Sequence, residues 1–203
     1  MAESNFEDAA QDNRTAEPQA QNFTSETYAK SKKQGVHIFR PDRMVDSVTE
    51  VPPAELKMRG ICGLIVDLDN TLVLWQQEEI ADHIMTWLME LQQLEIKLCV
   101  LSNSVLSTRS VRIAERLGIA NVRQARKPAK SGFLRAMEAM GTTPENTAIV
   151  GDQMFTDIWG GNRAGIYTIM VKPIHHREFL YTKYVSRPPE RLLLRYFKRR
   201  GHL

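Results

Sequence analysis

The chain is poor in cysteine and has no long apolar run. Its 203 residues include only two cysteines, Cys62 and Cys99, and both lie in apolar runs that are typical of strands. We expect both thiols to be buried and reduced, as in cytoplasmic proteins. Neither cysteine has a second metal ligand at the usual spacing, which argues against a zinc site. No apolar stretch reaches the roughly 18 residues of a membrane-spanning helix, and the N-terminus has no signal-peptide or transit-peptide pattern. These absences predict a cytoplasmic location.

The two ends of the chain differ in the kinds of side chain that they lack. Residues 1–33 contain few apolar side chains and more acidic than basic ones, so we expect this tail to be disordered. Residues 173–203 contain few acidic side chains and form a basic extension that ends in an amphipathic helix. This helix has three interpretations: packing on the core with its arginines in water, peripheral contact with anionic lipid, or RNA binding. No aromatic motif among the basic residues supports nucleic acid as a partner.

Residues 34–172 alternate between two periodicities. The expected strands are residues 61–66, 96–101, 121–122, 148–150 and 167–171. The expected helices are residues 80–91, 105–117, 131–140, 155–164 and, beyond this core, 188–200. Alternating strands and helices predict an α/β fold, namely a doubly wound, Rossmann-like parallel sheet with helices on both faces. Before the first strand, Pro41, Pro52 and Pro53 interrupt a lead-in segment that we expect to pack on this core.

Polar clusters follow four of the expected strands. They are Asp67-Leu-Asp69-Asn-Thr71, Ser102-Asn103-Ser104, Lys127-Pro128 and Gly151-Asp152 with Asp157. In a doubly wound sheet the carboxyl ends of the strands meet at one edge, so we expect these clusters to lie together. Four carboxylates gathered there are costly unless a cation or a proton offsets their charge. Carboxylate oxygens suit Mg²⁺, and the hydroxyl and the lysine remain to hold a phosphoryl group.

Together, these clusters resemble the four motifs of the haloacid dehalogenase (HAD) phosphatases in order and spacing. Asp69 is informative, because dehalogenase members of that superfamily lack the second carboxylate. More narrowly, residues 63–72 and 151–163 resemble the YqeG family of HAD subclass IIIA phosphatases. That family is similar to the mitochondrial and plastid phosphatidylglycerophosphate phosphatases. The resemblance extends over roughly residues 41–197 and implies a HAD core.

The resemblance also implies a role for each residue of the motifs. Asp67 is expected to be the nucleophile that forms an aspartyl-phosphate, and Asp69 the general acid and then base. The expected ligands of Mg²⁺ are Asp67, Asp69 through its backbone carbonyl, Asp152 and Asp157, the last directly or through water. The expected phosphate-binding residues are Ser102, Asn103 and Lys127. Lys130 is an alternative to Lys127, and the sequence leaves this choice open.

The spacing of the motifs leaves no room for an inserted cap domain. Between Asp67 and Ser102, and again between Ser102 and Lys127, the chain holds about one helix and its loops. An open site favours a bulky or surface-bound phosphate ester. With the basic C-terminus and the family resemblance, this predicts hydrolysis of phosphatidylglycerophosphate to phosphatidylglycerol and phosphate at a membrane surface. Two alternatives stay open. One is a phosphatase of soluble esters (nucleotide, sugar phosphate or phosphoprotein), and the other is a non-catalytic interaction scaffold.

Overall fold

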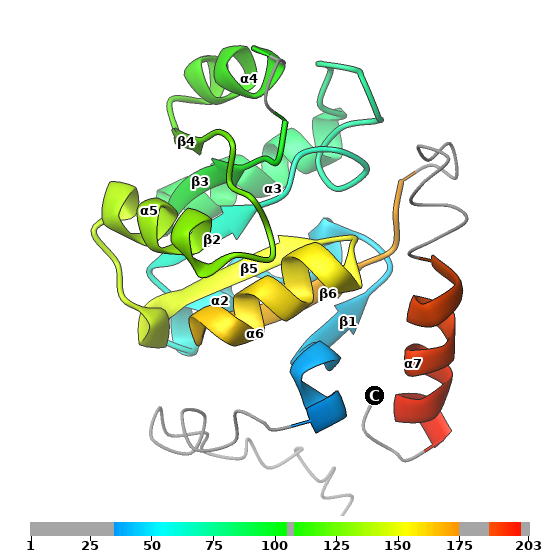
Figure 1. Ribbon diagram of the computed structural model, residues 1–203. Helices are drawn as coiled ribbons and strands as arrows, with labels where there is room; N and C mark the ends of the chain where they lie inside the picture. Colours follow the sequence, from blue (N-terminus) through cyan, green and yellow to red (C-terminus); the bar gives the residue numbers. More distant parts are fainter. Residues whose placement is uncertain (1–34, 105–107, 175–186, 200–203) are drawn as a thin grey trace, which may run out of the picture.

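A six-stranded parallel sheet forms the centre of the protein (Figure 1). The computed structural model describes residues 35–104, 108–174 and 187–199, so the tail of residues 1–33 lies outside the described residues. The strands, in the order β1-β6-β5-β2-β3-β4 across the sheet, are all paired in parallel. Their bounds are β1 (Arg43–Val45), β2 (Gly63–Val66), β3 (Lys97–Leu101), β4 (Ala120–Val122), β5 (Thr147–Gly151) and β6 (Tyr167–Val171). The predicted doubly wound sheet is therefore confirmed.

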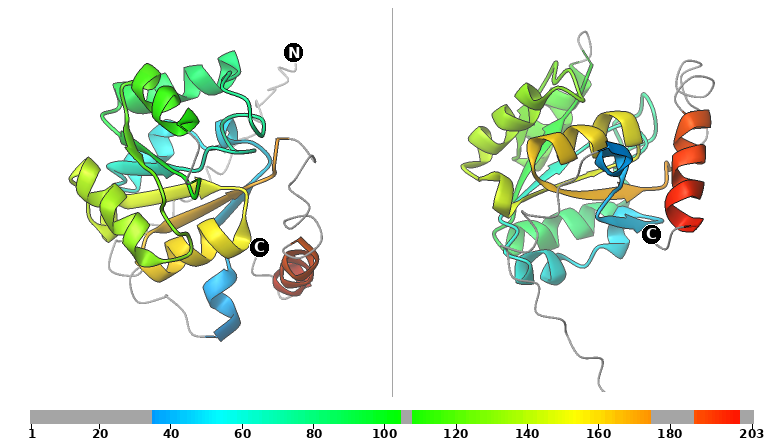
Figure 2. Two further views of the ribbon diagram at one scale, coloured as in Figure 1. Left: turned by 45° about the horizontal axis from the view of Figure 1, so that its top comes forward. Right: turned by 60° about the horizontal axis from the view of Figure 1, so that its bottom comes forward.

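Helices cover both faces of the sheet (Figures 1 and 2). The α-helices of the core are α2 (Pro53–Met58), α3 (Asp82–Gln93), α4 (Arg109–Leu117), α5 (Lys130–Met140) and α6 (Trp159–Ala164). Short helical turns are η1 (Gly35–Phe39), η2 (Val48–Glu50), η3 (Pro144–Asn146) and the π-turn η4 (Met154–Ile158). Successive strand residues point to opposite faces: Leu64 and Val66 join the core under α2, α3 and α4, whereas Ile65 joins the core under α5.

Several sequence expectations need correction. β1 was not predicted, because three residues in a proline-interrupted segment carry too little periodic signal; they pair with β6, from Arg43↔Ile169 to Val45↔Val171. The helix expected over residues 155–164 is divided into η4 and α6. The helix expected from residue 80 begins at Asp82, and residues 105–107 of the next expected helix lie outside the described residues.

One of the two cysteine predictions was wrong. Both thiols are free, and Cys99 is buried in β3, where burial raises the pKa of its thiol to about 12. Cys62 is exposed instead, because it precedes β2 rather than lying within it.

The last helix, α7 (Arg187–Arg199), lies beside the edge of the sheet formed by β1 and β6 (Figure 2). Leu193 and Leu194 pack against Met154, Ile158 and Met170. Its outer face exposes two large apolar side chains and three basic ones: Leu192, Tyr196, Arg195, Lys198 and Arg199. Within the described residues, no helix is both long enough and apolar enough to cross a bilayer. The described residues between β2 and β3, and between β3 and β4, contain no inserted cap domain.

Candidate active site

Two neighbouring strands deliver carboxylates to the same edge of the sheet. β2 and β5 pair directly, with Val66 opposite Val150, and the backbone amide of Asp67 continues this pairing by donating to the Val150 carbonyl at 3.0 Å. Asp67 therefore follows the end of β2 beside Asp152, which follows β5. Both side chains are buried. The sheet thus fixes the relative placement of these two carboxylates through its main-chain hydrogen bonds.

The π-turn η4 adds a third carboxylate. Asp157 is completely buried, and its Oδ2 accepts a hydrogen bond from the backbone amide of Gln153 at 3.1 Å. One carboxylate oxygen from each of Asp67, Asp152 and Asp157 lies within 4.8 Å of the others. Turns of the π type occur frequently at functional sites. Here the turn directs Asp157 back toward the end of β5.

Lys127 connects two of these carboxylates, those of Asp67 and Asp157. Its buried ammonium donates hydrogen bonds to Oδ1 of Asp67 and, at 2.7 Å, to Oδ1 of Asp157. The side-chain amide of Asn103 holds the backbone of Lys127 from both sides: Oδ1 accepts from its amide at 2.7 Å, and Nδ2 donates to its carbonyl at 3.1 Å. Lys130 is exposed at the first position of α5. Of the two lysines that the sequence left open, the fold brings Lys127 to the carboxylates.

The charges in this cluster do not balance. Burial raises the pKa of Asp67 to about 7, opposed by the ammonium of Lys127 and assisted by the charges of Asp157 and Asp69. Burial acts to lower the pKa of Lys127, but the carboxylates of Asp157 and Asp67 outweigh it and raise that pKa. In addition, Oδ2 of Asp67 is buried and accepts no hydrogen bond from the described residues. Three clustered carboxylates with an unsatisfied buried oxygen fit a small divalent cation.

Asp69 lies outside this group of three. Its carboxylate forms an ion pair with the guanidinium of Arg109, at the start of α4. The same guanidinium donates from Nη1 to the backbone carbonyl of Gln77 at 3.0 Å. Arg109 was missed by the sequence analysis, because nothing in the sequence distinguishes it from its neighbours Arg112 and Arg116. It ties the loop that follows Asp69 to the helix that follows Ser102.

Ser102 follows β3, the other neighbour of β2 in the sheet. Its side chain is buried, and its Oγ accepts from the backbone amide of Ser104 at 3.1 Å. This turn keeps the hydroxyl at the carboxyl end of the strand. Among the described residues, no hydrogen bond joins Ser102 to the carboxylates. The residues of all four predicted clusters thus meet at one edge of the sheet, at the ends of β2, β3 and β5 and on the segment before α5.

Comparison with known proteins agrees with this geometry. A family model of haloacid dehalogenase-like hydrolases matches residues 7–165. The chain belongs to the haloacid dehalogenase-like hydrolases. It is 37% identical to the probable phosphatase YqeG of Bacillus subtilis (strain 168), in a match that covers 82% of this chain and 95% of that protein. The predicted family and the predicted class of enzyme are therefore confirmed.

Two further proteins are similar to this chain at lower identity. The chloroplastic phosphatidylglycerophosphate phosphatase 1 of Chlamydomonas reinhardtii is 29% identical, over 68% of this chain and 52% of that protein. Among solved structures, the cobalt-bound deoxy-D-mannose-octulosonate 8-phosphate phosphatase of Haemophilus influenzae has a TM-score of 0.47 and 22% identity. That match covers 57% of this chain and 70% of the solved one.

Proposed function

We propose that this HAD hydrolase is a Mg²⁺-dependent phosphatase that forms an aspartyl-phosphate on Asp67. The observation that carries the proposal is the buried cluster of Asp67, Asp152 and Asp157, in which Lys127 pairs with Asp67 and Asp157. The proposed ligands of the ion are Asp67, the backbone carbonyl of Asp69, Asp152 and Asp157. When bound, Mg²⁺ offsets the excess negative charge and lets an anionic carboxylate approach an anionic phosphate.

In the first step, a carboxylate oxygen of Asp67 attacks the phosphorus and the bond from phosphorus to the alcohol oxygen breaks. Asp69 in its protonated form gives its proton to that departing oxygen. Lys127 and Ser102 hold the phosphate oxygens while negative charge shifts onto them. Asn103, proposed from the sequence as a phosphate ligand, acts through Lys127, since its side-chain amide holds the backbone of that residue. Arg109 orients the Asp69 carboxylate.

In the second step, the ionised Asp69 takes a proton from water as the water oxygen attacks the same phosphorus. The bond between phosphorus and Asp67 then breaks, and inorganic phosphate leaves. The sum is one ester and one water converted to one alcohol and one phosphate. Splitting the displacement into two in-line steps lets one carboxylate serve first as acid and then as base.

For the substrate, we propose phosphatidylglycerophosphate at a membrane surface. Three observations support it: the similarity to a phosphatase of that name, the lack of a cap among the described residues, and the basic, partly apolar outer face of α7. That face suits peripheral contact with anionic lipid. The alternative is a soluble ester (a nucleotide, a sugar phosphate or a phosphoprotein), which the open site also admits.

The nucleophile is tested by Asp67→Asn. Because the amide is a far weaker nucleophile than the carboxylate, turnover of para-nitrophenyl phosphate in Mg²⁺ should fall at least about a thousandfold. Circular dichroism checks that the fold is retained. Glu138→Gln, on the exposed face of α5, is the matched control and should keep wild-type turnover. A variant at residue 67 that retains even a tenth of the activity would exclude the proposed mechanism.

The substrate is tested separately with vesicles that contain phosphatidylglycerophosphate. Release of phosphate from these vesicles should exceed release from glycerol 3-phosphate and from nucleoside monophosphates at equal phosphate concentration. Efficient hydrolysis of a soluble ester with no release from vesicles would replace the lipid by the soluble class and leave the mechanism intact.

A further inference from the structure

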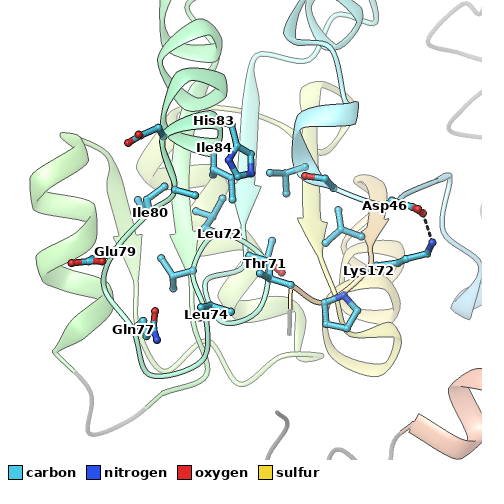
Figure 3. A pocket seen from close by; sticks show the side chains of 18 residues that line it. Asp46, Thr71, Leu72, Leu74, Gln77, Glu79, Ile80, His83, Ile84 and Lys172 are labelled. Carbon is cyan, nitrogen blue, oxygen red and sulfur yellow. Dashed lines mark ion pairs between the residues drawn. The ribbon is translucent and has the colours of Figure 1, made fainter. Parts of the chain in front are cut away.

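We propose that a cavity beside Asp69 binds the alcohol moiety of the substrate ester and that it favours an alcohol with an apolar part. This inference rests on the proposed function, since it assigns the leaving group of that reaction to a place in the fold. Figure 3 shows the cavity, which has a volume of about 730 Å³ and thus suits a ligand of moderate size. It lies between the loop after Asp69, the start of α3, and the segments that follow β1 and β6.

The position of the cavity follows from Arg109. One guanidinium contacts both the carboxylate of Asp69 and the backbone carbonyl of Gln77, and Gln77 is part of the cavity lining. A single planar group therefore connects the carboxylate of Asp69 to a residue of the cavity lining. Thr71 and Leu72 also line the cavity and follow Asp69 by two and three residues, a path of at most about 11 Å.

The chemistry of the proposed reaction then decides which part of the substrate lies here. A general acid must be within hydrogen-bond reach of the oxygen that it protonates. If Asp69 protonates the departing oxygen, the first carbon of the alcohol lies next to Asp69, on the side away from the phosphate. Arg109 links Asp69 to the cavity lining, and Thr71 and Leu72 of that lining follow Asp69 closely, so we place the alcohol in this cavity.

The lining indicates the kind of alcohol. Ten of the 18 residues that line the cavity are apolar: Val48, Leu72, Val73, Leu74, Ile80, Ala81, Ile84, Val171, Pro173 and Ile174. The charged groups stand at the exposed rim, where Asp46 and Lys172 form an ion pair of 2.6 Å (Figure 3). Glu79 and Asp82 are also exposed, so acidic groups outnumber the single lysine of the lining. The apolar walls thus favour an apolar part of the alcohol, and each methylene that leaves water should improve binding by up to about fourfold.

The kinetic test compares hexyl phosphate with ethyl phosphate, which differ only in the apolar part. For the wild type, kcat/KM should be at least about tenfold higher for the hexyl ester. Leu74→Asn places a polar group in the cavity and should reduce this ratio to below about threefold. Ile174→Asn is a second cavity variant at an exposed position, in case the first does not fold. Leu134→Asn, an exposed leucine of α5 outside the cavity, should keep the wild-type ratio.

A binding measurement separates failure of this inference from failure of the proposed function. Hexylphosphonate and ethylphosphonate have no cleavable ester bond, so calorimetry reports their affinities without turnover. The wild type should bind hexylphosphonate at least about tenfold more tightly, and Leu74→Asn should lose most of this difference. Equal affinities, or equal kcat/KM values for two esters that are both hydrolysed, would overturn the apolar site alone. Preferential binding of hexylphosphonate without hydrolysis of either ester would support the site and overturn the phosphatase mechanism.

Discussion

Gly151, the last residue of β5, leaves the space that the carboxylate of Asp157 occupies. A Cβ at this position would lie 2.5 Å from Oδ2 of Asp157, closer than such atoms approach each other. Gly151→Ala should therefore displace Asp157 from Lys127 and lower kcat by about ten- to a hundredfold. Overpacking should also reduce the free energy of unfolding by about 1–3 kcal/mol. Steady-state kinetics at saturating Mg²⁺ and urea unfolding measure the two effects.

The matched control for this substitution is Gly161→Ala in α6. A Cβ there would lie 2.7 Å from side-chain carbons of Ile149 and Thr168, which are apolar contacts away from the carboxylates. This variant should lose similar stability but keep wild-type kcat at a temperature where it is folded. If both variants lose the same fraction of kcat, the effect at residue 151 is general destabilisation rather than displacement of Asp157.

For single residues, the sequence predicted which side chains come together at the site but not every partner of each side chain. Asp67, Asp152 and Lys127 could be predicted, because each follows a strand or precedes a helix at the edge where the strands end. The contact of Asn103 with the backbone of Lys127 could not be predicted, because Lys127 lies in a loop 24 residues further along the chain. Arg109 could not be singled out for a similar reason: its partner Asp69 is 40 residues away.

Among the elements, α7 supports the π-turn that presents Asp157. The buried carboxylate of Glu190 accepts a hydrogen bond from the backbone amide of Met154, the first residue of η4, at 2.9 Å. Glu190→Ala removes this acceptor and should cost about 1–3 kcal/mol of the free energy of unfolding. Because Asp157 lies on the same turn, the concentration of Mg²⁺ needed for half-maximal activity should rise severalfold. Urea unfolding and Mg²⁺ titration of activity provide the measurements.

Two variants of the same helix isolate this contact. Glu190→Gln keeps an oxygen acceptor of the same length and should recover most of the Mg²⁺ affinity. Leu192→Ala changes an exposed side chain of α7 and should behave as the wild type. Identical Mg²⁺ requirements in the alanine and glutamine variants would contradict a role for this hydrogen bond.

A second contact between elements, that of β1 with α2, should depend on pH. Burial acts to raise the pKa of Glu55, but hydrogen bonds from Arg43 and Arg59 outweigh it and lower the pKa from 4.5. A lowered pKa means that the ionised form stabilises the fold above the pKa of the unfolded state, and that this contribution disappears as pH falls through the folded pKa. Glu55→Gln should thus lose at most about 1 kcal/mol at pH 7 and nothing well below pH 4.

Thermal unfolding of both proteins at pH 7 and at pH 3 measures this difference. Glu90→Gln, at an exposed position of α3, serves as the control with no expected difference at either pH. A deficit of Glu55→Gln that persists unchanged at pH 3 would show that lost packing, rather than lost charge, is responsible.

The elements that the sequence did not predict are those without a periodic pattern of their own. β1 has three residues and gains its stability from pairing with β6, a contact more than 120 residues away in sequence. The π-turn η4 has a spacing that a helical pattern cannot distinguish from an α-helix over five residues. The four longer strands could be predicted because buried parallel strands are continuous apolar runs.

For the molecule as a whole, strand order determines which motifs can meet. β2 lies between β5 and β3, so the segments after these three strands converge although they are separated by up to about 85 residues. Helices on both faces bury the strands and therefore the first residues beyond them. The fold thus concentrates three carboxylates at buried positions, which lowers the stability of the whole protein.

We therefore expect Asp67→Asn, which should abolish turnover, to increase the stability of the fold when no cation is bound. In EDTA, Asp67→Asn removes one of three clustered carboxylates and an ionised form that burial disfavours, so the variant should be more stable than the wild type by about 1–3 kcal/mol. Adding Mg²⁺ should stabilise the wild type, because the ion binds the folded state, and should stabilise the variant much less. Thermal unfolding with and without 10 mM Mg²⁺, at about pH 8, tests both statements; Glu138→Gln should follow the wild type throughout. A variant that is less stable than the wild type in EDTA would mean that the ion pair of Asp67 with Lys127 outweighs the repulsion among the carboxylates, and that the site is stable without a cation.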